Sequence, residues 1–165
     1  MCEWAGVSCA GSRVTGLDFG AGSSGRGLTQ GSKSWLSGDV GLLAGATALE
    51  EIDLSGTSVS GSVEPFAELT QLTILDLRST DVSGSVEPLA ALAQQLTRLS
   101  LYSTCVSGSV EPLAALTQLQ ELHLADTDVY GNATVLRAAG IRGTFLGGDA
   151  PSDPDWPSSY FGDAS

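Results

Sequence analysis

Basic side chains are scarce in this chain. Of its 165 residues only 7 are Lys or Arg, against 19 Asp or Glu, so the formal net charge is −12. A protein that binds nucleic acid needs a basic surface to neutralise phosphates, and this composition therefore argues against DNA or RNA as a partner. A cationic or neutral protein surface is a better match for so acidic a chain.

Histidine and long apolar segments are also rare. The single histidine, His123, excludes a metal site built from several imidazoles, and we expect neither a metal nor a cofactor. The longest apolar runs are far too short to cross a bilayer. No charged and apolar leader precedes "CEWAGVSC" at residues 2–9. We therefore expect either an intracellular chain or the mature or trimmed form of a longer one.

The chain contains four copies of one sequence pattern. Thr57, Thr80, Thr104 and Thr127 are spaced 23, 24 and 23 residues apart, and each ends the pattern L-x-x-L-x-L-x-x-T. Each Thr is followed by Val and Gly at fixed offsets, and "VSGSVEP" is identical in three copies. A period in the twenties with L-x-x-L-x-L is the signature of a leucine-rich repeat. The sequence therefore predicts a solenoid, whose stacked repeats share one continuous core.

Each part of the repeat predicts a local structure. The L-x-L segment alternates with a period of two, which predicts a short strand with its leucines facing inward. The Thr residues should form an inward ladder whose hydroxyls bond backbone groups in the turn that would otherwise be buried without a partner. The "VEPLAALTQL" arm predicts a short helix or 3₁₀ turn that begins at its Pro. The expected fold is a right-handed α/β superhelix, with parallel strands on the concave face and helical, 3₁₀ or irregular arms on the convex face.

The predicted boundaries describe one domain with a tail. We expect a single leucine-rich-repeat domain over 1–147, and residues 148–165 as an acidic tail with the aromatic residues Trp156, Tyr160 and Phe161. The parts of the domain are an amino-terminal cap at 1–12, degenerate first repeats at 13–48 with a Gly/Ser loop at 20–35, four regular repeats at 49–131, and an irregular repeat at 132–147.

The amino-terminal segment carries a family resemblance. Residues 2–9 read C-x-W-x-G-V-x-C, and "RVTGLDF" follows at 13–19. This resembles the cap of plant-type leucine-rich-repeat proteins. The repeats depart from the family pattern in having Thr in place of Asn, and Glu before the Pro of each arm. Relatives of this type include receptor ectodomains, secreted enzyme inhibitors and ice-binding proteins, so the resemblance implies a fold more than a function.

The resemblance also bears on the cysteines. In the family the two cap cysteines are oxidised, which implies a Cys2–Cys9 disulfide and a secreted, extracellular or organelle-lumenal location. Two free thiols in a cytosolic protein are the alternative. The third cysteine, Cys105, follows Thr104 at an exposed type of position, where a free thiol or an intermolecular bridge is open to it, but we expect it to be incidental.

The strand positions that face outward vary between repeats, whereas the turns do not. Arg and Tyr, which are favoured at interfaces, occur among these variable positions. We therefore expect a protein partner to bind the concave strands, although ordinary variation of a solvated surface would give the same contrast. The predicted partner-binding residues lie at or near the centre of that face: Ile74, Arg78, Arg98, Tyr102, His123, Asp53 and Asp76.

Other functions remain open at the level of sequence. Asp53 and Asp76 fall on neighbouring strands, but an exposed sheet offers no pocket to tune their pKa values, so we expect no enzyme. A small accessory subunit of a larger, membrane-associated assembly is an alternative, with the tail either docking on a neighbour or covering the end of the solenoid. Ice binding and enzyme inhibition are further alternatives. The Thr columns suggest the former, but charged residues interrupt the neighbouring positions.

Overall fold

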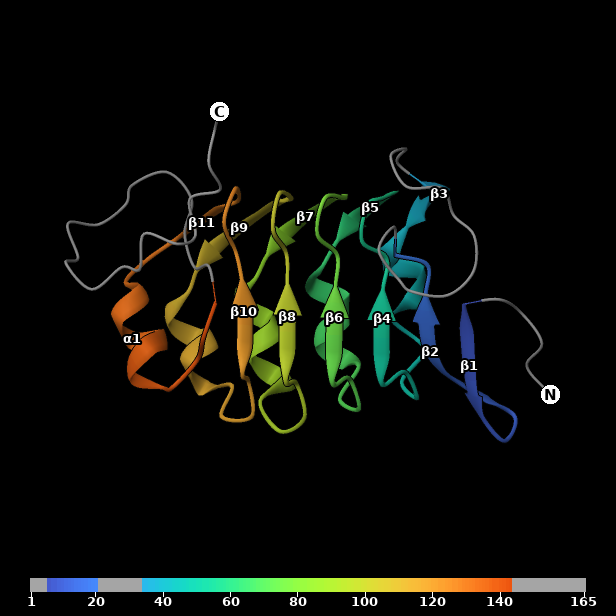
Figure 1. Ribbon diagram of the computed structural model, residues 1–165, viewed down its shortest axis with the longest axis horizontal. Coiled ribbons are helices and arrows are strands. Elements are labelled where there is room, and N and C mark those ends of the chain that lie inside the picture. Colours follow the sequence, from blue (N-terminus) through green and yellow to red (C-terminus); the bar gives the residue numbers. More distant parts are fainter. Residues whose placement is uncertain (1–5, 21–33, 144–165) are drawn as a thin grey trace, which may run out of the picture.

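The computed structural model describes residues 6–20 and 34–143, which form a solenoid with one sheet on each side of a shared core (Figure 1). The leucines of the repeat fill this core. Leu72, Leu75 and Leu77 are completely buried, and the equivalent residues of the other three regular repeats are at most 4% exposed. Each such side chain contributes about 2 kcal/mol of hydrophobic stabilisation. The predicted inward direction of the L-x-L leucines is therefore confirmed.

The first sheet contains the strands that the repeat pattern predicts. Its order is β1-β2-β4-β6-β8-β10, and all neighbours are parallel except β1 and β2. The register joins equivalent residues of successive repeats, so that Leu75 pairs with Ile52 on one side and Leu99 on the other. The strands span Val7–Ala10 (β1), Arg13–Asp18 (β2), Glu51–Asp53 (β4), Ile74–Asp76 (β6), Arg98–Ser100 (β8) and Glu121–His123 (β10).

A second parallel sheet lies on the opposite side of the core, where the sequence predicts only turns and irregular arms. Its order is β11-β9-β7-β5-β3, and Figure 1 shows it behind the first sheet. Its strands are rich in Ser and Gly, so their composition gives little sign of a sheet. They span Ser34–Asp39 (β3), Thr57–Ser62 (β5), Asp81–Ser85 (β7), Cys105–Ser109 (β9) and Asp128–Tyr130 (β11).

Short helices complete each repeat. As predicted, a Pro stands at the start of η2, η3 and η4. The last helix, α1, is capped by Asn132 and closes the irregular repeat near the carboxy-terminal end. The 3₁₀ helices span Val40–Leu43 (η1), Glu64–Glu68 (η2), Glu87–Leu92 (η3) and Glu111–Ala115 (η4), and the α-helix spans Ala133–Ala138 (α1).

The glutamate before each Pro joins one repeat to the next. Glu64 accepts a hydrogen bond from the Ser85 N–H at 3.2 Å, and Glu87 accepts one from the Ser109 N–H at 3.1 Å. Glu111 does the same with the Asn132 N–H at 2.9 Å. The departure of "VEP" from the family pattern thus gives these repeats a side-chain bond to the backbone of their neighbour.

The threonine ladder is confirmed. Thr57, Thr80, Thr104 and Thr127 each donate their hydroxyl to the backbone carbonyl three residues earlier, at 2.5–2.7 Å. Thr57 is completely buried and Thr80 is 3% exposed. The hydroxyls of Thr57 and Thr80 therefore satisfy acceptors that water does not reach, and they are not available to a surface ligand such as ice.

Candidate functional site

The outward side chains of the first sheet form two rows across its strands. Parallel pairing places equivalent residues of neighbouring repeats side by side and on the same face. We call this face, together with the residues that follow each strand, the variable face. The first row is Glu51, Ile74, Arg98 and Glu121, and the middle row is Asp53, Asp76, Ser100 and His123.

A third row lies just beyond the strand ends and contains Ser55, Arg78, Tyr102 and Ala125. Backbone hydrogen bonds link this row across repeats through the residue that follows each member. The Gly56 N–H donates to the Arg78 carbonyl at 2.9 Å, and the Ser79 N–H donates to the Tyr102 carbonyl at 2.8 Å. Arg78 and Tyr102 are therefore in neighbouring positions of adjacent repeats. Both are exposed, and Tyr102 is 41% exposed.

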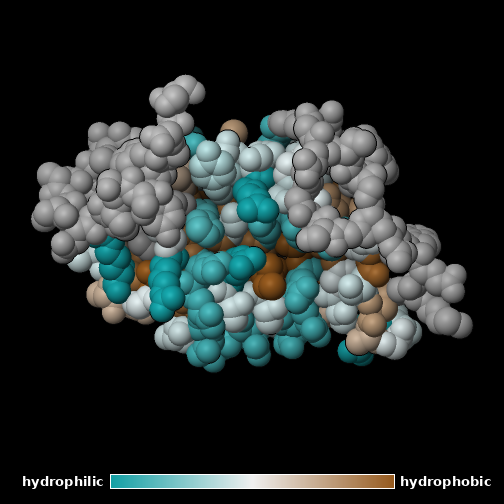
Figure 2. Space-filling model, in the orientation of Figure 1, coloured by the Kyte–Doolittle hydropathy of each residue, from teal (hydrophilic) through white to brown (hydrophobic). Residues whose placement is uncertain are grey.

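Burial divides the predicted binding residues into two groups. Arg78, Arg98 and Tyr102 are exposed, whereas the remaining ones are half-buried or buried. Asp76 is only 7% exposed. The half-buried members are Ile74, Asp53 and His123. Figure 2 shows the same side of the molecule as mainly hydrophilic, with an apolar patch near its middle.

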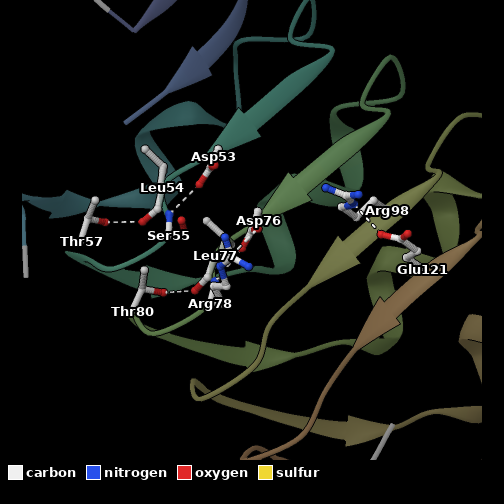
Figure 3. Close-up of polar contacts among 10 residues, drawn as sticks. All are labelled: Asp53, Leu54, Ser55, Thr57, Asp76, Leu77, Arg78, Thr80, Arg98 and Glu121. Carbon is white, nitrogen blue, oxygen red and sulfur yellow. Dashed lines mark hydrogen bonds and ion pairs between the residues drawn. The ribbon is translucent and has the colours of Figure 1, made fainter. Parts of the chain in front are cut away.

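Asp76 acts mainly on its own repeat. Its carboxylate accepts a hydrogen bond from the Arg78 N–H at 3.2 Å and lies 3.5 Å from the Arg78 Nε (Figure 3). Burial raises the pKa of the Asp76 carboxyl; the Arg78 N–H and the charges of Arg78 and Arg98 oppose this rise, and the charge of Asp53 adds to it. Asp76 therefore fixes the turn that presents Arg78, and little of it is left for a partner.

Asp53 has the same local role one repeat earlier. Its carboxylate accepts a hydrogen bond from the Ser55 N–H at 3.0 Å, two residues on, which is an Asx turn. The Ser55 hydroxyl beside it is buried, and it has no hydrogen-bond partner in the described part of the chain. The two aspartates thus shape the turns that follow β4 and β6.

Arg98 and Tyr102 each have an acidic partner in the next repeat. The Arg98 Nε lies 2.7 Å from a Glu121 carboxylate oxygen, and the two side chains are 50% and 46% exposed (Figure 3). Because water screens such a pair, it contributes less than about 1 kcal/mol to stability. A hydrogen bond from the Tyr102 hydroxyl to Asp126, together with the charge of that carboxylate, raises the pKa of Tyr102. Both side chains are therefore oriented while they remain exposed.

The structure adds Arg142 to the first row, a residue that the sequence analysis did not single out. Arg142 forms an isolated parallel bridge with Glu121, and its carbonyl accepts a hydrogen bond from the Leu122 N–H at 2.8 Å. It is exposed. Leu136 and Ile141 are both buried and belong to a further turn of the solenoid. These two apolar residues are the signal in the sequence that points to Arg142 as the next strand-like position.

Charge is distributed unevenly along the variable face. Asp18 pairs in register with Asp53, so the amino-terminal strands carry the acidic residues Asp18, Glu51 and Asp53. Three of the seven basic residues of the chain, Arg78, Arg98 and Arg142, lie toward the other end. The face is therefore acidic over the end of β2 and over β4, whereas from β6 onward the three arginines are matched by Asp76, Glu121 and Asp126.

Several predicted features lie outside the described residues. Cys2 is one, so the Cys2–Cys9 disulfide remains a prediction, and so do the roles of Trp156, Tyr160 and Phe161. Most of the predicted loop at 20–35 also falls there, although β3 already begins at Ser34. Cys105 lies on β9 and is exposed, without a disulfide partner among the described residues.

Two other kinds of site are absent from the part of the chain that the structure describes. Over 6–20 and 34–143, His, Cys, Asp and Glu side chains form no group of three or more that is arranged to hold a metal ion. In the same residues, no helix has the length and apolar character needed to span a membrane.

Comparisons with solved structures identify the fold. The chain is similar to the leucine-rich-repeat ectodomain of the receptor kinase SOBIR1 from Arabidopsis thaliana, with 24% identity and a TM-score of 0.70 over 88% of this chain and 82% of that one. It is similar to the BIR2 ectodomain from the same plant, with 24% identity and a TM-score of 0.68 over 92% and 80%.

A longer ectodomain is also similar. The ectodomain of GASSHO1/SCHENGEN3 from Arabidopsis thaliana, in complex with CASPARIAN STRIP INTEGRITY FACTOR 2, shares 25% identity and a TM-score of 0.58 over 67% of this chain, which spans 14% of that one. No protein-family model and no curated protein sequence matches the chain. The chain is thus a leucine-rich-repeat solenoid, similar in structure to the ectodomains of plant receptors.

Proposed function

We propose that this solenoid recognises a protein or peptide partner through its variable face, without a catalytic step. The observation that carries the proposal is the arrangement of Arg78, Arg98 and Tyr102, which are exposed on adjacent repeats and are each held by an acidic side chain. Arg and Tyr are the residues that most often dominate binding at protein interfaces. Side chains that are already ordered also lose less conformational entropy on binding.

The uneven charge of the face supports the same proposal. Within the described residues, the unmatched acidic residues Asp18, Glu51 and Asp53 at one end, and Arg78, Arg98 and Arg142 beyond them, give a partner a direction along the solenoid axis. Complementary charges of this kind speed association and exclude wrong partners more than they add affinity. A partner segment that crosses the strands would place basic groups near Asp53 and acidic groups near Arg98 and Arg142.

Similarity to receptor ectodomains is consistent with this function. The GASSHO1/SCHENGEN3 ectodomain has been crystallised with CASPARIAN STRIP INTEGRITY FACTOR 2. For the present chain we propose a comparable binding role and, from the cap at residues 2–9, a secreted, extracellular or organelle-lumenal location. The cap cysteines would form their disulfide in such an oxidising compartment.

Affinity capture followed by titration tests the proposal. The oxidised full chain is used to capture partners from native extract, and a partner identified by mass spectrometry is purified and titrated. We expect Arg98→Glu combined with Tyr102→Ala to weaken its binding at least about tenfold, which corresponds to roughly 1.4 kcal/mol. Both side chains are exposed, so the fold should persist.

A matched control uses the opposite sheet. Ser107→Glu combined with Tyr130→Ala also adds a carboxylate and removes an exposed tyrosine, but on β9 and β11. We expect it to bind as the unmodified chain does. Equal binding by the variant of the variable face, with loss in the control, would show that the partner uses the second sheet. Retention of a whole complex by both variants, with loss when residues after Gly148 are deleted, would favour the accessory-subunit alternative.

A further inference from the structure

The only asparagine of the chain, Asn132, begins the tripeptide Asn132-Ala133-Thr134. Asn-x-Ser/Thr with x other than Pro is the acceptor sequence for N-linked glycans in secretory compartments. A short sequence of this kind is common by chance, so its meaning depends on where the asparagine lies. In this structure both residues are exposed: Asn132 lies on the short connection between β11 and α1, and Thr134 is the second residue of α1.

The local geometry leaves the acceptor nitrogen of Asn132 on the outside. Its side-chain Oδ1 accepts a hydrogen bond from the Thr134 N–H at 2.9 Å and caps α1. Only the oxygen of an amide can accept from an N–H, so this bond fixes which end of the amide faces the helix. The Nδ2 group is therefore directed away from the cap, and an attached sugar would not break it.

The surroundings can accommodate a glycan. Asn132 is itself exposed, and Tyr130, two residues before it, is 63% exposed. Strand β11 is also the last strand of the second sheet, which leaves one of its edges unpaired by any strand of the described chain. Exposed sheet edges favour edge-to-edge association, and a bulky polar group beside this edge would hinder it. The variable face belongs to the other sheet, so a partner could still bind there.

We propose that Asn132 is an N-glycosylation site. This proposal rests on the proposed secretory or lumenal location and not on the use of the variable face. In the transfer step, Asn132 Nδ2 forms a bond to C1 of the first sugar of an oligosaccharide diphospho-lipid. The bond between C1 and the phosphate oxygen breaks, Nδ2 loses a proton, and the lipid diphosphate leaves. The donor lipid and the transferase belong to the secretory compartment, and no oxidation or reduction is involved.

Expression of the full chain in a eukaryotic secretory host, behind a cleavable signal peptide, tests the proposal. The intact mass is measured before and after digestion with an amidase that removes N-glycans and converts the acceptor Asn to Asp. We expect a sugar mass on the secreted chain that disappears on digestion, with the Asp located at position 132. A secreted chain with the unmodified mass would overturn the proposal.

Two variants at Thr134 separate recognition from folding. Thr134→Ser keeps the hydroxyl that the acceptor sequence requires and should be glycosylated, whereas Thr134→Ala should lose the sugar completely. Both keep the backbone N–H that Asn132 caps, so neither removes the helix cap. A sugar that persists in Thr134→Ala would contradict the assignment. A secreted chain that has formed the Cys2–Cys9 disulfide but carries no sugar would overturn the glycosylation site and leave the proposed location intact.

Discussion

The threonine ladder makes a quantitative prediction for the substitution Thr80→Val. Valine has nearly the same shape as threonine, so the change removes the hydroxyl and leaves the packing almost intact. In the structure this hydroxyl donates to the Leu77 carbonyl at 2.6 Å, and Thr80 is 3% exposed. A lost hydrogen bond costs about 1 kcal/mol, and a buried acceptor left without its donor costs about 1–3 kcal/mol. We expect Thr80→Val to lower the free energy of unfolding by about 1–2 kcal/mol.

A matched substitution in the last regular repeat controls for the choice of residue. Thr127 donates the same bond to the Leu124 carbonyl, but Thr127 is only partly buried, so water can replace the lost donor. Thr127→Val should therefore cost less, about 0.5 kcal/mol. Urea unfolding followed by circular dichroism gives both values, and an unchanged slope would show that the denatured state is unaffected. Equal stability of Thr80→Val and the unmodified chain would refute the assigned role of the ladder.

Three further substitutions test other parts of the structure by the same assay. Ser103 has a φ of 55°, in the left-handed region, so Ser103→Gly should stabilise the fold by about 0.5 kcal/mol and Ser103→Val should destabilise it. Gly84 has a φ of 98°, and a Cβ there would lie 2.5 Å from the Ser62 Oγ. Gly84→Ala should therefore lower the free energy of unfolding by about 1–3 kcal/mol. Gly45 has open space around it, so Gly45→Ala should lower it by less. Burial raises the folded-state pKa of Asp76 above 3.8, so protonation favours the folded state, and this contribution is lost as the pH rises through the folded-state pKa. Asp76→Asn should therefore gain stability relative to the unmodified chain as the pH rises from acid to neutral; a pH-independent difference would contradict this.

The sequence predicts the repeated half of the fold well because its signals are local. The L-x-L alternation places Leu75 and Leu77 in the core, and both are fully buried. The Thr hydroxyls bond within their own turn, so their role also depends on nearby residues alone. The Pro at the start of each 3₁₀ helix is a signal of the same local kind.

Features that depend on neighbouring repeats are harder to predict. The second sheet is made of Ser- and Gly-rich strands, which pair with residues 21–22 positions away and show little apolar alternation of their own. The burial of Asp76 depends on the side chains around it, because alternation alone places it on the surface. Arg142 joins the variable face only because residue 142 pairs with Glu121. The sequence thus predicts the exposed residues Arg78, Arg98 and Tyr102 of the variable face, but it predicts neither Arg142 nor the burial of Asp76.

The three tyrosines of the chain offer the most direct test of the central claim, that the partner binds the variable face. Tyr102 lies on that face, Tyr130 lies on the second sheet, and Tyr160 belongs to the tail. We would label exposed tyrosines covalently with and without the captured partner and measure each site by mass spectrometry. The account predicts that the partner protects Tyr102 and leaves Tyr130 labelled. Protection of Tyr130 or Tyr160, with Tyr102 labelled as before, would contradict it.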